Sequence, residues 1–248
     1  MAIEPPVARI TLQHPPLNVI DIPMMEEMAM AVAEVEQMPA VSMTVFAGSG
    51  SGFSAGVDVA AHKPERVQEM LTKFHAILRA LVTSRKVTLA AVRGNCLGGG
   101  AELAILCDLV VTAETATWGF PEISLGCFPP VAATALAALV GQKRAAELIL
   151  TGRTFDGAEA QRLGLANYST RDAQLETRTE VVLEHLAKLS PAALAVTKKA
   201  MYAWDSMHFD KGLSRAEKVY FEELMWTQDA REGVAAFLEK RAPKWTGK

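Results

Sequence analysis

Two glutamates that stand in apolar surroundings are the residues best suited to chemistry. Glu102 lies in the first turn of an apolar helix pattern that begins at Gly99, and Glu122 follows 20 residues later within WGFPEISLG. Burial disfavours the charged form and raises a carboxyl pKa toward the range that suits acid–base catalysis. Either residue alone could be a solvated acid or could complement a helix dipole. Together they indicate two carboxyl groups that share one water molecule.

Three consecutive glycines, at 98–100, indicate an anion-binding turn beside Glu102. Glycine lets a ligand approach the backbone closely, and the free N–H groups at a helix N-terminus stabilise negative charge. A tight turn from a strand into a helix would also use glycine, but three in a row exceed its usual need. We therefore expect backbone donors next to the carboxyl groups.

Other catalytic patterns are weaker. The segment from Gly50 to Ala55 fits the dinucleotide pattern GxGxxA, but an amphipathic helix pattern stands where that motif needs an acid at the end of a second strand. Ser54 is not in a GxSxG sequence, which argues against a hydrolase triad. We expect no metal site, because no ligand-like spacing occurs among His14, His62, His75, His185, His208, Cys96, Cys107 and Cys127.

Composition argues against several classes of protein. The chain has 248 residues, of which 50% are apolar and 21% charged, and its formal net charge is −3. These values argue against disorder and against a nucleic-acid-binding surface. Pro129 and Pro130 split the uncharged stretch 123–141, so the helix that follows them is too short to span a membrane. The start MAIEPPVARI does not resemble a secretion signal and the cysteines read as free thiols, so we expect a cytoplasmic protein.

Hydrophobic periodicity predicts the elements that position the glutamates. Strands are expected at 7–13, 41–47, 87–92, 109–113 and near 166–169, and helices at 23–38, at 65–84, from Gly99 and over most of the chain beyond Val131. Twice a strand runs into a glycine-rich loop and then a helix, at 41–58 and 87–102. The predicted fold class is therefore α/β, with a helical C-terminal part.

Five segments resemble those of the enoyl-CoA hydratase/isomerase (crotonase) superfamily. They are FSAGVD (53–58), AAVRGNCLGGGAELAILCD (90–108), FPEISLG (120–126), LILTGRTFDGAEAQRLGLAN (148–167) and REGVAAFLEKR (231–241). The resemblance implies a spiral of ββα units over residues 1–189 and a helical region over 190–248 in the same structural unit. That region would build a homotrimer or a dimer of trimers. Its apolar residues Leu194, Val196, Met201, Trp204, Leu213, Phe221, Leu224 and Trp226 fit such an interface.

The resemblance also implies roles for single residues. The backbone N–H groups of Val57 and Gly99 would form an oxyanion hole for a thioester oxygen, beside Glu102 and Glu122 as catalytic residues. CoA contacts are implied for Ala55, Gly56, Asp58 and Lys240. Members of the superfamily with other reactions generally lack one glutamate, so the pair favours water addition, a hydro-lyase reaction. No separate cofactor is implied, because CoA is part of the substrate.

One segment, 127–133, departs from the family pattern, which is commonly glycine-rich there. It borders the acyl pocket, to which we assign Trp118, Phe128 and Pro130. The two aromatic rings would offer flat apolar surfaces, and the proline would make the pocket wall more rigid than glycine would. The segments 15–28, 53–62 and 119–133 most resemble hydratases of a cyclic thioester, cyclohexa-1,5-diene-1-carbonyl-CoA. The alternatives are a straight-chain enoyl-CoA hydratase, an enoyl-CoA isomerase of the same fold and a non-catalytic acyl-CoA-binding protein.

Overall fold

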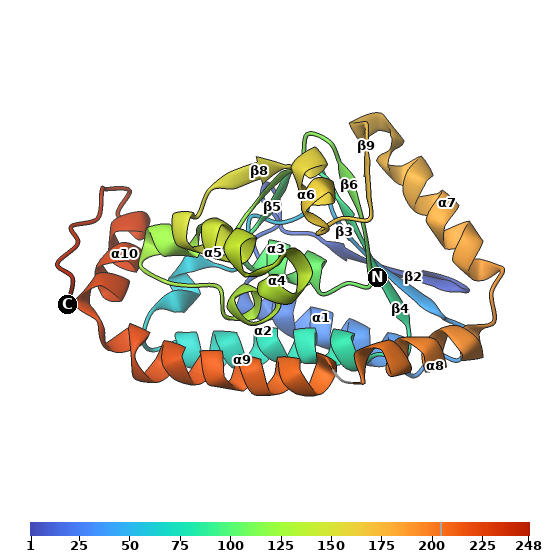
Figure 1. The fold of residues 1–248 in the computed structure, drawn as a ribbon, viewed down its shortest axis with the longest axis horizontal. Coiled ribbons are helices and arrows are strands. Elements are labelled where there is room, and N and C mark those ends of the chain that lie inside the picture. Colours follow the sequence, from blue (N-terminus) through green and yellow to red (C-terminus); the bar gives the residue numbers. More distant parts are fainter. Residues whose placement is uncertain (204) are drawn as a thin grey trace.

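A six-stranded sheet forms the centre of the molecule (Figure 1). The structure, a computed structural model, describes residues 1–203 and 205–248, and the side chains of 205–207 are outside its description. The strand order is β1-β2-β3-β4-β6-β9, with β1 antiparallel to β2 and every other pair parallel. The strands are β1 (Ala2–Glu4), β2 (Val7–Leu12), β3 (Met43–Gly48), β4 (Val87–Val92), β6 (Leu109–Ala113) and β9 (Tyr168–Thr170).

A second, three-stranded sheet carries the residues around the glycine turn. Its strands are β5 (Asn95–Leu97), β7 (Thr117–Gly119) and β8 (Thr154–Asp156), with β7 in the middle. The helices are α1 (Ile22–Glu36), α2 (Val67–Thr83), α3 (Gly99–Ile105), α4 (Pro130–Val140), α5 (Gln142–Thr151), α6 (Gly157–Leu163), α7 (Leu175–Ala187), α8 (Pro191–Tyr202), α9 (Asp205–Glu222) and α10 (Gln228–Leu238). Short 3₁₀ helices span Val59–His62, Pro121–Leu125, Asp172–Gln174 and Leu224–Trp226.

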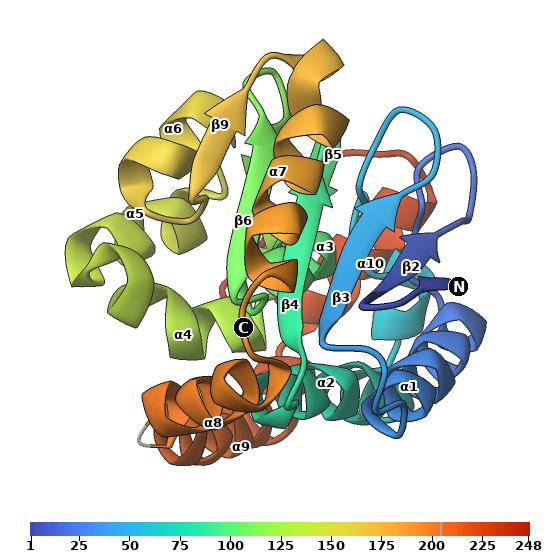
Figure 2. The same ribbon diagram turned by 90° about the vertical axis from the view of Figure 1, so that its right-hand side faces the viewer.

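The two faces of the large sheet are covered by different helices. Alternate side chains of a strand point to opposite faces, so Val45 packs toward α7 while its neighbour Phe46 joins the core formed with α1, α2 and α3. Figure 2 shows α7 lying across one face of the strands and α1 and α2 below their ends. Both faces are therefore buried, as expected for parallel strands.

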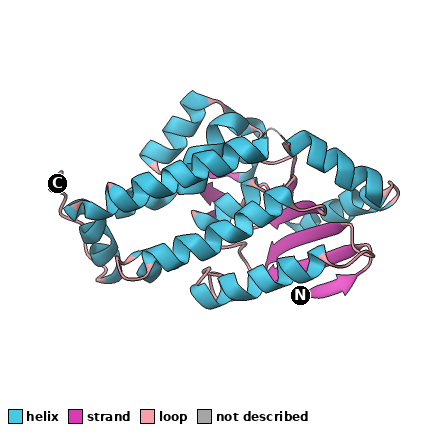
Figure 3. Cartoon of the chain, turned by 90° about the horizontal axis from the view of Figure 1, so that it is seen from below, coloured by secondary structure: helices cyan, strands magenta, loops and turns pink. Residues whose placement is uncertain are grey.

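The C-terminal helices pack on the core. Helix α9 contacts α2 and α4, and the long helices lie side by side in Figure 3. Two residues of α9, Leu213 and Tyr220, are fully buried in the main hydrophobic cluster. Helix α8 is tied to the core by the buried Lys198, whose Nζ donates to the carbonyls of Leu81 and Lys86 and lies 2.7 Å from Asp108 Oδ2.

Most of the predicted elements are confirmed, within a few residues at their ends. Strand β4 has the predicted bounds, and the α/β class is correct. The sequence analysis missed β1, β5, β7 and β8, because three-residue strands contain too few residues to show alternation. The first predicted unit of strand, glycine loop and helix, at 41–58, does not lead directly into an α-helix. A 3₁₀ turn at 59–62 follows the loop, and α2 begins only at Val67. Among the described residues, no helix combines the length and the apolar content needed to cross a bilayer.

Candidate active site

A cavity of about 70 Å³ lies where α2, α3, α4 and α9 meet the loop after β3. This volume has room for several water molecules, since one needs roughly 10–15 Å³. Eight residues that the sequence analysis selected line the cavity: Ala55, Gly56, Val57, Gly99, Glu102, Glu122, Phe128 and Pro130. These residues come from four separate segments of the chain, so the fold brings the predicted site together.

Two backbone N–H groups adjoin this cavity. Gly56 O accepts from Ile20 N at 2.9 Å and Asp58 N donates to Ile20 O at 3.1 Å. The N–H of Val57, between them, therefore points to the opposite side. Gly99 is the first residue of α3, so its N–H has no partner within the helix. The start of α3 packs closely against the loop that carries Val57. If Gly99 had a Cβ atom, that atom would lie only 2.6 Å from Val57 Cγ2.

Glu102 is anchored at the N-terminus of another helix. Its carboxyl oxygen Oε1 accepts from the N–H groups of Val131 and Ala132, both at 2.9 Å, in the first turn of α4. The two prolines before them have no N–H to offer. Burial raises the pKa of Glu102, while the Ala132 and Val131 N–H groups and the nearby His75 act to lower it. These donors favour the ionised form of a carboxyl group that is only 3% exposed.

Glu122 has the opposite environment. It lies in the 3₁₀ helix at 121–125, and its buried Oε2 has no hydrogen-bond partner in the described part of the chain. Its Oε1 lies close to Gly98, where a Cβ would come within 2.7 Å of it. Burial and then the charge of Glu102 raise the pKa of Glu122 well above its ordinary value. Of the two carboxyl groups, Glu122 therefore holds its proton more strongly, and Glu102 is the one whose hydrogen-bond donors favour ionisation.

Three predicted site residues lie outside the cavity lining. Trp118, which the sequence analysis assigned to the acyl pocket, is fully buried in the core and donates from its indole N–H to Thr112 Oγ1 at 3.0 Å. Asp58 caps the 3₁₀ turn at 59–62 by accepting from Ala60 N. Lys240 is exposed just after α10, in a left-handed backbone conformation with φ of 55°.

Several lining residues were not selected from the sequence. Phe74 and Met70 come from α2, His62 from the 3₁₀ turn and Tyr220 from α9. Tyr220 is separated from Glu122 by almost a hundred residues of sequence, so no local spacing could indicate that the two are close. Among the residues that the structure describes, no three His, Cys, Asp or Glu side chains cluster in a way that could hold a metal ion.

Comparisons with known proteins agree with this geometry. The family model described as enoyl-CoA hydratase/isomerase matches residues 2–248. A cyclohexa-1,5-dienecarbonyl-CoA hydratase from Thauera aromatica is 37% identical over 96% of this chain and 92% of its own. A "Probable enoyl-CoA hydratase" from Rhizobium meliloti is 37% identical over 95% and 92%. A solved enoyl-CoA hydratase from Mycobacterium avium subsp. paratuberculosis superposes with a TM-score of 0.89 at 27% identity, covering 99% of this chain and 97% of that one. The chain belongs to the enoyl-CoA hydratase/isomerase family and has the crotonase-like fold that the sequence analysis predicted.

Proposed function

We propose that the protein adds water to an α,β-unsaturated acyl-CoA thioester, with Glu102 as the base and Glu122 as the acid. The observation that carries this proposal is the pair of buried carboxyl groups beside the N–H groups of Val57 and Gly99, of which Glu102 accepts two backbone hydrogen bonds and Glu122 Oε2 accepts none among the described residues. Groups whose environments separate their pKa values in this way can divide acid and base roles.

The proposed reaction balances within the site. Glu102 takes a proton from water, the water oxygen bonds to the β-carbon, and negative charge moves to the thioester oxygen. The Val57 and Gly99 N–H groups stabilise that oxygen, and removal of one such donor costs about 3–4 kcal/mol in comparable sites. Glu122 then gives its proton to carbon, and a proton passes from Glu102 to Glu122 before the next turnover.

For the acyl group, we propose the cyclic dienoyl thioester cyclohexa-1,5-diene-1-carbonyl-CoA. The cavity is small and has the aromatic walls Phe74, Phe128 and Tyr220, which suit a compact ring better than a long chain. Pro129 and Pro130 stiffen one side of it. The Thauera aromatica relative is named for this substrate. In such a diene, charge from attack at the β-carbon delocalises over the second double bond, so the proton can reach the remote carbon in a 1,4-addition.

CoA contacts are proposed for four residues. Ala55 and Gly56 line the cavity mouth beside Val57, and Asp58 follows them directly. Lys240 provides an exposed cation at the end of α10, and a cation suits a CoA phosphate.

The alternative functions can be told apart by experiment. Product analysis separates the hydratase from an isomerase of the same fold, and turnover separates both from an acyl-CoA-binding protein.

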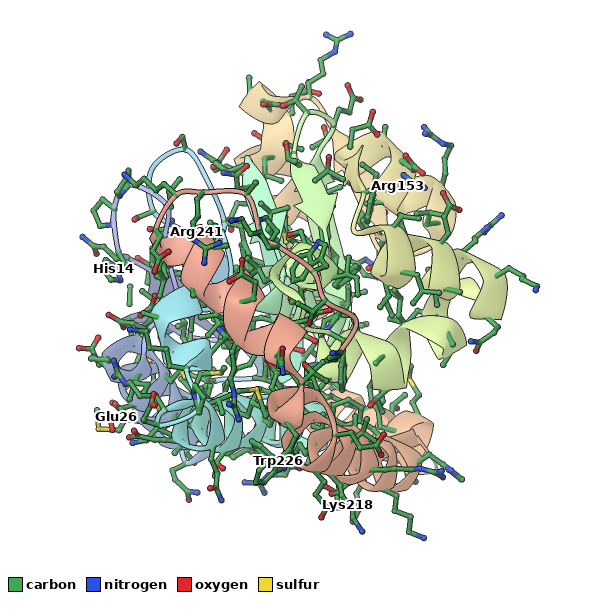
Figure 4. All side chains as sticks on the ribbon, turned by 90° about the vertical axis from the view of Figure 1, so that its left-hand side faces the viewer. His14, Glu26, Arg153, Lys218, Trp226 and Arg241 are labelled. Atoms are coloured by element: carbon green, nitrogen blue, oxygen red, sulfur yellow. The ribbon has the colours of Figure 1, made fainter. Side chains whose placement is uncertain are left out.

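We propose a homotrimer or a dimer of trimers as the assembly. Of the apolar residues assigned to an interface, Leu213 is buried within the chain, and Phe221 and Leu224 pack against the core. Val196, Met201 and Trp226 stay exposed, with Trp226 at 75%. Figure 4 labels Trp226 where the chain passes from α9 to α10. Trp204 lies outside the described residues.

The cytoplasm is the proposed location. The three cysteines, Cys96, Cys107 and Cys127, are free and buried. Burial raises the pKa of each of these thiols, that of Cys127 to about 11, which keeps them unreactive. Free thiols are typical of proteins in a reducing compartment.

The first prediction concerns the glutamates. Glu102→Gln and Glu122→Gln should each lower kcat by about 10²–10⁴, the usual contribution of acid–base catalysis, while the exposed Glu34→Gln should have no effect. In the wild type, kcat/KM should fall in acid as Glu102 becomes protonated and in base as Glu122 loses its proton. Full hydratase activity in either variant would disprove the assignment.

These variants can be checked for folding by their thermal stability. The pKa of Glu122 is higher in the folded than in the unfolded protein, so above the unfolded pKa of about 4.3 its ionisation favours unfolding. Glu122→Gln should therefore have an unchanged or higher Tm at pH 8.

The second prediction concerns Gly98. An alanine there is strained at φ 49° and presses on Glu122 Oε1, so Gly98→Ala should lower both stability and kcat. The matched control is Gly50→Ala, where φ is 67° and the added Cβ meets nothing within 4 Å. The control should lose stability only, as measured by Tm and steady-state rates. Equal kcat in the two variants would contradict this role for Gly98.

The third prediction concerns the acyl group. The purified protein should hydrate the cyclic dienoyl-CoA with a kcat/KM at least tenfold above that for crotonyl-CoA. The hydrated product should carry the new proton at the remote carbon, which deuterium incorporation from D₂O and NMR can locate. A preference for crotonyl-CoA would make the protein a straight-chain enoyl-CoA hydratase.

The fourth prediction concerns the assembly. Light scattering should give three or six times the chain mass of 26.7 kDa. Trp226→Asp should lower the mass, because it places a charge on an apolar surface that we propose is covered. Met30→Asp is the control, since Met30 is 64% exposed on α1, outside the C-terminal helices. A monomer at micromolar concentration would rule out the proposed trimer.

A further inference from the structure

Tyr220 reaches the active-site cavity from the C-terminal helix α9. It is 1% exposed and lines the cavity together with Glu102 and Glu122. Its hydroxyl oxygen is buried and makes no hydrogen bond of ordinary geometry in the described part of the chain, where the thiol of Cys127, a weak acceptor, is its polar neighbour. A buried hydroxyl without a partner costs stability, so in most proteins such groups are satisfied. An unpaired hydroxyl that borders a reaction cavity is therefore a candidate for contact with a ligand.

The position of this hydroxyl is fixed by packing on several sides. The Tyr220 ring lies against Phe128, with centroids 5.1 Å apart and planes tilted by 60°, and against Phe221 at 6.2 Å. One helical turn earlier, Glu217 accepts from His75 at 2.7 Å and from Arg79 at 3.0 and 3.1 Å, which holds α9 against α2. Tyr220 is therefore oriented before substrate binds.

The hydroxyl can act only as a neutral group. Burial raises the pKa of Tyr220 well above its usual range, and the neighbouring Cys127, Glu122 and Glu102 raise it further. The phenol therefore keeps its proton through the reaction, and it can donate a hydrogen bond without serving as an acid. Tyr220 lines the same cavity as Glu102 and Glu122, and both glutamates act on its pKa. The phenol therefore lies beside the reacting groups.

Among the oxygen atoms of the reactants, the proposed reaction leaves one acceptor for this donor. The thioester oxygen is bound by the Val57 and Gly99 N–H groups, and the rest of an unsaturated acyl group is hydrocarbon. The other oxygen in the reaction is that of the water, which becomes the hydroxyl of the product. We propose that Tyr220 is a further catalytic residue whose hydroxyl donates a hydrogen bond to this oxygen; this inference rests on the proposed hydratase function.

The hydrogen bond would act in both directions of the reaction. In hydration, it holds the water for proton removal by Glu102 and attack on the β-carbon. In dehydration, the C–O bond breaks and the electron pair stays on the leaving oxygen, where a donor stabilises the developing charge. The Tyr220 proton does not leave the phenol, so the proton balance of the two glutamates is unchanged.

Tyr220→Phe tests the proposal, because it removes the hydroxyl and keeps the ring. The variant should lower kcat/KM about tenfold to a hundredfold, the range for a hydrogen bond to an oxygen that carries charge. The loss should be equal for hydration and dehydration, since the equilibrium constant cannot change. Its Tm should be unchanged or higher, because the removed hydroxyl has no strong hydrogen-bond partner among the residues that the structure describes. The Kd for a saturated acyl-CoA, butyryl-CoA, should stay within twofold, because that ligand has no hydroxyl.

Tyr168→Phe is the matched control, since it removes a tyrosine hydroxyl in β9, outside the cavity, from a ring that packs under Arg178. A Tyr220→Phe rate within twofold of this control would overturn the proposal. A lower Tm with an unchanged rate would also overturn it and would identify a structural hydrogen bond, for example to Cys127. If the wild-type protein binds butyryl-CoA but hydrates neither crotonyl-CoA nor the cyclic dienoyl-CoA, the proposed function fails, and the role of Tyr220 fails with it.

Discussion

The contact between the Glu102 carboxylate and the first turn of α4 is the interaction on which the rest of the site depends. Two N–H donors at a helix N-terminus hold one oxygen of a buried carboxyl group and favour its ionised form. Burial, and then this negative charge, raise the pKa of Glu122. In the proposed mechanism, this difference between their surroundings makes one carboxyl group the base and the other the acid.

The C-terminal helices contribute to the site as well as to the proposed interface. Lys198 of α8 donates to backbone carbonyls of the core, and Glu217 of α9 accepts from His75 and Arg79 of α2, which holds α9 against α2. Burial opposes the ionisation of Glu217, but hydrogen bonds from His75 and Arg79 prevail and lower its pKa to about 2. The ion pair between Glu217 and Arg79 therefore persists well into the acid range. Helix α9, part of the region that we propose for assembly, thereby also forms one wall of the cavity.

The sequence predicts those features whose signal is local. Glu102 and Glu122 stand out because a carboxyl group in an apolar segment is costly, and the strands around them show regular alternation. The failures have different causes. Trp118 is close in sequence to Glu122, but strand β7 turns its side chain into the core, where Thr112 satisfies the indole N–H. Tyr220 enters the cavity through helix packing that joins distant segments, and a single sequence carries no local signal for such contacts.

The segment that departs from the family pattern has two roles that cannot be separated. Pro129 and Pro130 line the cavity as rigid residues, and their missing N–H groups leave Val131 and Ala132 as the first donors of α4. Those donors hold Glu102, so the prolines that we propose for the acyl pocket also set the position of the carboxyl group that we propose as the base. A change that widens the pocket by replacing the prolines would shift the start of α4 and move the carboxylate with it. In the proposed function, the choice of acyl group and the geometry of catalysis are therefore linked through one helix N-terminus.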